Sequence, residues 1–94
     1  MTVRVKLQIN GKEIDQTFSG ESPDAVVDQM RKTAAEQSPW LVRTAINRMT
    51  PVHFAQEAVK RFNAGTGGKH PIPDTCDAFL ATGKSMGIVQ VISN

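Results

Sequence analysis

The sequence predicts an α+β fold of two layers, in which three to four helices cover one face of a small, mostly antiparallel sheet. Three observations lead to this prediction: an alternating pattern at the start of the chain, three hydroxyl–proline pairs in its middle, and an apolar run near its end. Because the expected strands are not interleaved with the helices, the two ends of the chain supply the sheet. We expect residues 1–94 to fold as a single domain.

The first eighteen residues predict a β-hairpin. Apolar and polar side chains alternate from residue 3 to residue 9, as in a strand with one buried face. The following Asn10-Gly11 favours a two-residue turn of type I′, in which both positions need a positive φ angle. This turn sets the pairs across the hairpin: Val3 with Phe18, Leu7 with Ile14, and Lys6 with Asp15 on the solvent side.

Three hydroxyl–proline pairs, Ser22-Pro23, Ser38-Pro39 and Thr50-Pro51, predict helix starts. In each pair the hydroxyl suits the N-cap, and proline suits the first helical position, where no amide donor is needed. Apolar residues recur at helical spacing after each pair, and Gly65 closes the third series. We therefore expect helices at about 23–36, 39–48 and 51–63.

The remaining third of the chain predicts a loop, a short helix and a strand. Residues 64–73 are rich in glycine and proline, which is typical of a loop. A fourth helix is expected to begin near Asp74 or Thr75 and to end at Gly83. The apolar residues at 88–92 then predict the last strand.

This last strand indicates that the protein pairs with another chain. A tight hairpin keeps the first two strands adjacent, so the third strand of a three-stranded sheet lies at an edge. Edge strands usually carry charges, proline or a bulge that prevent pairing with another chain, whereas this strand has no charged residue. We expect a homodimer in which a second copy pairs with this edge, unless a helix or the glycine-rich loop covers it. The residues of this expected dimer edge are Ile88, Val89, Gln90, Val91 and Ile92.

The middle of the chain is basic, although the net charge is only +2. Residues 38–70 carry five basic side chains against Glu57 alone. This suggests an alternative function, nucleic-acid binding through the basic surface of the helices at 38–63. A helical pair between Glu57 and Arg61 would neutralise part of that surface. The residues expected to contact a partner or an anion are Trp40, Arg43, Arg48, Lys60, Arg61, Lys69 and His70.

Three of these candidates have a second interpretation. Trp40 follows Pro39 at a helix start, where a large ring usually packs on a neighbouring layer; an exposed ring would mark a contact site. Lys69 and His70 follow clustered glycines, whose amides can form an anion-binding nest. Because glycines in loops chiefly give backbone freedom, a flexible connector is the preferred interpretation.

Cys76 suggests a third function, a small enzyme or accessory subunit in which this thiol works with His53 or His70. The flanking Asp74 and Asp77 oppose a thiolate there, and burial as a small apolar residue is the commoner role of a cysteine. These residues do not match the ligand pattern of structural zinc. We expect neither a metal nor a cofactor.

The preferred interpretation is a small non-enzymatic binding or regulatory module that contacts an unidentified protein. A balance of 39% hydrophobic and 21% charged residues indicates a folded chain. The single cysteine cannot form an internal disulfide, which favours the cytoplasm. No apolar run is long enough to span a bilayer, and Met1 leads directly into a strand rather than a signal peptide, so we expect no membrane association.

Overall fold

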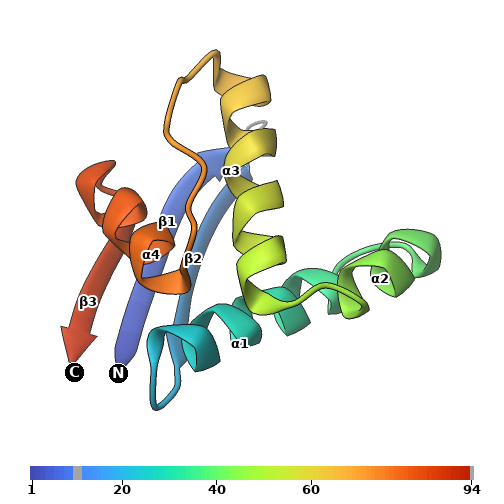
Figure 1. Cartoon of the computed structure of the whole chain (residues 1–94), viewed down its shortest axis with the longest axis horizontal. Helices are drawn as coiled ribbons and strands as arrows, with labels where there is room; N and C mark the ends of the chain where they lie inside the picture. Colours follow the sequence, from blue (N-terminus) through green and yellow to red (C-terminus); the bar gives the residue numbers. More distant parts are fainter. Residues whose placement is uncertain (10–11, 94) are drawn as a thin grey trace.

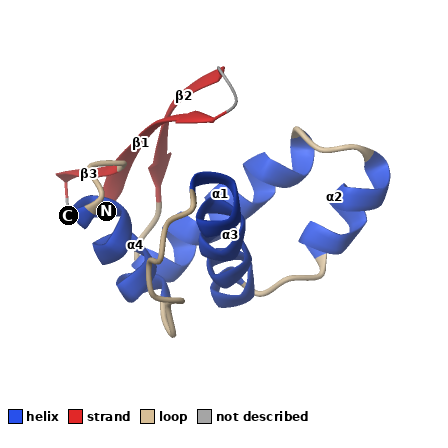
Figure 2. Ribbon diagram, turned by 90° about the horizontal axis from the view of Figure 1, so that it is seen from above, coloured by secondary structure: helices blue, strands red, loops and turns tan. Residues whose placement is uncertain are grey.

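The computed structural model describes residues 1–9 and 12–93. Along the chain, the elements are β1 (Thr2–Ile9), β2 (Lys12–Ser19), α1 (Pro23–Glu36), α2 (Trp40–Asn47), α3 (Pro51–Thr66), α4 (Cys76–Ser85) and β3 (Val89–Ser93). The strands form one antiparallel sheet, and α1, α3 and α4 lie on one side of it (Figure 1). Seen from above, the sheet and the helices make two layers, and α2 lies at the end far from β3 (Figure 2). The predicted α+β fold is confirmed.

The hairpin has the predicted register. Val3 pairs with Phe18, Leu7 with Ile14 and Lys6 with Asp15. The ion pairs run diagonally instead of straight across: Arg4 binds Asp15 through two hydrogen bonds of 2.8 and 2.6 Å, and Lys6 lies 3.8 Å from Glu13. The hydrogen bond from Arg4 holds the pKa of the Asp15 carboxyl below its ordinary value. The predicted Asn10-Gly11 turn lies outside the described residues.

The strand order is β2-β1-β3, so the last strand lies at an edge as predicted. It begins at Val89 instead of Ile88 and ends at Ser93. Its register on β1 shifts between Val91 and Ser93, which leaves Ile92 without a partner residue in β1. This irregularity turns the end of the strand out of the regular ladder.

Helix capping follows the prediction at two of the three hydroxyl–proline pairs. Ser22 and Thr50 accept hydrogen bonds from the backbone three residues ahead, at 3.2 and 3.1 Å, with proline in the first turn. The prediction for Ser38 is wrong. Its hydroxyl donates to the Ala34 carbonyl at 2.7 Å, so it satisfies the end of α1, and the N-cap of α2 is Pro39. α2 begins at Trp40, so Ser38 lies one residue before the N-cap position.

Two predicted helix ends were too early. α3 continues through Gly65 and ends where Gly67 takes a left-handed φ of 70°. α4 continues through Gly83 to Ser85. Gly83 serves packing: a Cβ built there would lie 2.6 Å from a methyl carbon of Val89, so glycine lets β3 approach the helix closely.

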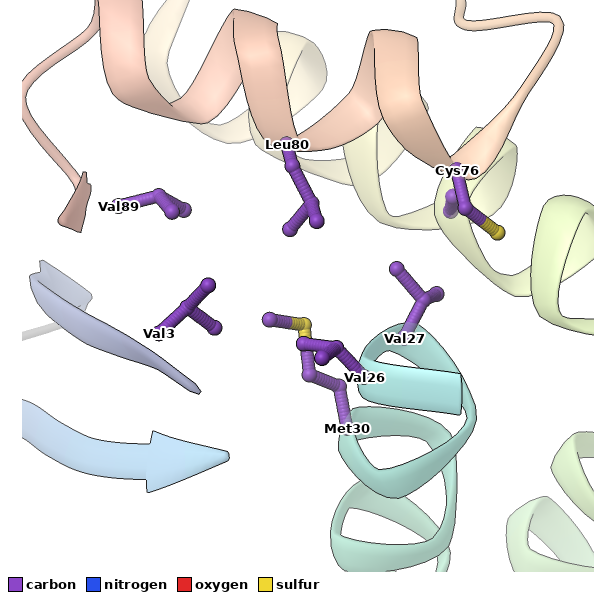
Figure 3. Close-up of a cluster of buried hydrophobic side chains, with 8 residues drawn as sticks. Val3, Val26, Val27, Met30, Cys76, Leu80 and Val89 are labelled. Carbon is purple, nitrogen blue, oxygen red and sulfur yellow. The ribbon is translucent and has the colours of Figure 1, made fainter. Parts of the chain in front are cut away.

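The core lies between the sheet and three helices. Figure 3 shows side chains from β1, α1, α4 and β3 that point toward one another. The buried cluster consists of Val3, Val26, Val27, Met30, Ala55, Cys76, Leu80 and Val89. All eight residues of α2 are described, and none of them is buried.

Candidate interaction surfaces

Along β3, alternate backbone groups point toward β1 and away from it. Lys6 donates its backbone N–H to the Ile88 carbonyl at 2.9 Å. In an antiparallel ladder, hydrogen-bonded and non-bonded pairs alternate, so Gln90 is the next residue of β3 that bonds to β1. The backbone groups of Val89 and Val91 therefore point away from β1. Within the described residues, β3 pairs with β1 alone.

The side chains of β3 do not protect this edge. Val89 is buried against α4, Val91 is half-buried, and Gln90 is exposed on the opposite face of the sheet. Ile92 is 54% exposed. The other edge strand, β2, carries exposed charges such as Asp15. The two edges of one sheet thus differ in charge, and the register shift at Ile92 is the irregularity that interrupts the β3 edge.

A second surface lies on α2, where apolar side chains face solvent. Trp40 is 74% exposed, Leu41 65% and Val42 40%. Ala45, one turn after Leu41, is exposed as well. We call these four residues the α2 patch. The sequence predicted that the Trp40 ring packs on a neighbouring layer, whereas the ring is exposed, and only Ile46 of α2 is half-buried.

α2 contacts α1 through the side that carries Arg43 and the half-buried Ile46. Arg43 donates to three backbone carbonyls around the end of α1, those of Ala35 at 3.1 Å, Glu36 at 3.4 Å and Ser38 at 3.2 Å. In return, Arg31 of α1 donates to the Ile46 carbonyl at 3.4 Å. Carbonyls at a helix C-terminus carry partial negative charge, so a guanidinium is a favourable partner for them.

The basic residues expected at a partner site are divided between separate elements. Arg43 is committed to the end of α1, and Arg48 is exposed at the end of α2. Lys60 and Arg61 lie on α3, where the first is 3.6 Å from Glu57. Glu57 therefore pairs with Lys60, whereas the sequence predicted a helical pair between Glu57 and Arg61. Of these four cations, Arg43 and Lys60 have intramolecular partners.

The loop after α3 is tied back to that helix. Asn63 accepts from the backbone N–H of His70 at 3.1 Å and donates to its carbonyl at 2.9 Å. The rings of Phe62 and His70 lie 5.8 Å apart. These contacts make the loop an ordered connection at His70, while Lys69 beside it is exposed. An open hollow of about 380 Å³ next to this loop is lined by His70, Pro71, Ala81, Thr82, Ser85 and Met86.

Cys76 lies in the core, where its side chain has no exposed area. Burial, together with the charge and hydrogen bond of Asp24, raises the pKa of the thiol from 9.0 to about 11. Neither histidine forms a hydrogen bond with this thiol in the described part of the chain, and the hollow beside His70 does not include it. The arrangement favours a neutral thiol, which is a poor nucleophile.

Comparison of the chain with known protein families, curated proteins and solved structures finds no match. Among the described residues, no group of three His, Cys, Asp or Glu side chains has the arrangement of a metal site. None of the described helices combines the length and apolarity needed to cross a membrane.

Proposed function

We propose that this chain is a binding module that acts by protein–protein contact and assembles as a homodimer through β3. The observation that carries the proposal is the outward backbone of Val89 and Val91 on an edge strand without charge. An edge of this kind is a template for another strand. When a second copy pairs with this strand, the same contact covers the unpaired edge of both chains.

The register offers a self-complementary pairing. If two β3 strands meet antiparallel with Gln90 on the two-fold axis, Val89 of each copy lies opposite Val91 of the other. Both residues have outward backbone groups, so each such pair forms two hydrogen bonds. The valines also continue the core face of the sheet across the axis, because they share one side of the strand.

The two alternatives have less support. Nucleic-acid binding requires several cations that reach phosphates together, and two of the four candidates already have intramolecular partners. A cysteine enzyme requires an accessible thiolate, and Cys76 is buried with a raised pKa. An unpaired buried thiol is compatible with the reducing cytoplasm that the sequence predicts.

The test introduces a charge at residue 90, which lies on the two-fold axis of the proposed dimer. Gln90→Lys puts two like charges opposite each other in the dimer, so we expect wild-type protein to sediment as a dimer and this variant as a folded monomer. The matched control is Gln29→Lys, which adds the same charge to the exposed surface of α1. The proposal is wrong if wild-type protein stays monomeric at high concentration, or if Gln90→Lys remains dimeric.

A further inference from the structure

The apolar side of α2 points away from the protein. In a helix each residue turns by about 100°, so Leu41, Ala45 and Val42 share an arc of about 100°, and Trp40 lies about 100° from Leu41 on the other side. Arg43 lies about 160° from Ala45 by the same geometry, and it faces α1. In an ordinary surface helix the apolar side faces the core. Here Leu41 and Ala45 face solvent, and the side with Arg43 and the half-buried Ile46 makes the intramolecular contacts.

We infer that the α2 patch is a docking surface for an amphipathic helix of another protein, one whose apolar stripe is flanked by carboxylates. Trp40 and Leu41, the most exposed large side chains of the patch, would anchor the apolar stripe. Tryptophan and arginine are the residue types most enriched among the side chains that dominate binding energy in protein interfaces. Arg48 supplies the arginine at the same surface.

The charge around the patch selects an acidic partner. Arg48 lies about 20° from Leu41 around the helix, by its spacing of seven residues, and it is exposed. Between Glu36 and Glu57 the chain has two arginines and no acidic residue. A second copy of α2 would therefore bring like charges together, whereas a carboxylate beside the apolar stripe would pair with Arg48.

The same arginine disfavours a lipid surface. A helix that lies in a membrane keeps its charges on the side opposite the inserted residues. Arg48 is on the side of Leu41, so insertion of the patch would carry a guanidinium toward the acyl chains. The helix also spans only about 12 Å. A protein helix of two or three turns matches that length and can offer a partner to the charge.

The α2 patch and the β3 edge lie at opposite ends of the molecule in both views (Figures 1 and 2). Docking at α2 therefore does not depend on the proposed dimer, and a dimer paired through β3 would present two patches. The two proposals can fail separately, because Gln90→Lys alters only the β3 edge.

The experiment uses the fluorescence of Trp40, the only tryptophan in the chain. The probes are a synthetic helical peptide with one leucine stripe flanked by glutamate and the same peptide with lysine in place of glutamate. We expect the glutamate peptide to shift the Trp40 emission to shorter wavelength, because the ring leaves water. Arg48→Glu should lower the affinity for the glutamate peptide by about tenfold, since the attraction between Arg48 and glutamate becomes a repulsion. The same substitution should raise the affinity for the lysine peptide.

Two further variants complete the test. Leu41→Ser should abolish the shift with unchanged circular dichroism, and Lys84→Glu, at an exposed position of α4, should leave the preference unchanged. The inference is overturned if the glutamate peptide causes no shift, or if both peptides bind wild-type protein equally. It is also overturned if anionic vesicles or a higher concentration of the protein alone produce the larger shift, because the occupant is then a membrane or a second copy.

Discussion

The two short helices α2 and α4 have similar apolar content and opposite roles. α4 places Cys76 and Leu80 in the core and packs closely on β3 at Gly83. α2 places no residue in the core, and arginine–carbonyl hydrogen bonds connect it to α1. Thus an apolar helical face does not by itself show that the rest of the chain covers it.

The starts of the two helices differ in the same way. The Thr75 hydroxyl accepts from the Ala78 N–H at 3.0 Å and caps α4. The N-cap of α2 is Pro39, and no side chain in the described part of the chain caps it. α4 is therefore defined by both capping and burial, whereas α2 depends on its contacts with the end of α1.

The largest expected effect is the loss of the α4 anchor. Leu80 is 4% exposed, so Leu80→Ala removes buried methyl groups and leaves a cavity, at a cost of about 2–5 kcal/mol in the free energy of unfolding. Urea unfolding followed by circular dichroism measures this cost. A loss no greater than that of a surface substitution would contradict the placement of Leu80 in the core.

A second prediction concerns pH and the thiol at the start of α4. The raised pKa means that the unfolded chain loses the Cys76 proton at a lower pH than the folded chain. The folded state therefore loses stability as pH rises from about 9 toward 11. Urea midpoints across this range should fall more steeply for wild-type protein than for Cys76→Ser, whose hydroxyl does not titrate there. Parallel slopes would contradict the raised pKa.

A smaller effect is expected at the cap of α4. Thr75→Ala removes the acceptor for the Ala78 N–H and should lower the free energy of unfolding by about 1 kcal/mol. Thr75→Ser keeps the hydroxyl and is the matched control, so it should restore most of the loss in the same urea titration. Equal losses in both variants would show that the hydroxyl is not the cause.

The smallest effect is expected on α2. Leu41→Ala changes a side chain that is 65% exposed, and the free energy of unfolding should change by no more than about 0.5 kcal/mol. The same urea titration compares it directly with Leu80→Ala. A cost similar to that of Leu80→Ala would mean that α2 packs against its own chain, and the comparison between the two helices would fail.

Local signals in the sequence determined the elements and much of the sheet. The alternation of residues 3–9 and the pairing of Val3 with Phe18 were correct, because a strand with one buried face tolerates no slip of one residue. Ser22 and Thr50 marked helix starts, since capping is decided within one turn. The edge position of β3 followed from the hairpin alone.

The tertiary structure decided which surfaces are covered. Hydrophobic periodicity gives the direction of the apolar face around a helix axis and not the side on which the rest of the chain lies. Arg43 reaches carbonyls of α1, and the sequence offered only a weak signal for this contact, a lone arginine opposite the apolar residues. The prediction for Ser38 was wrong because α2 begins at Trp40, one residue later than expected, and the hydroxyl donates to the carbonyl of Ala34 at the end of α1. Such choices depend on contacts between segments, so local propensity cannot determine them.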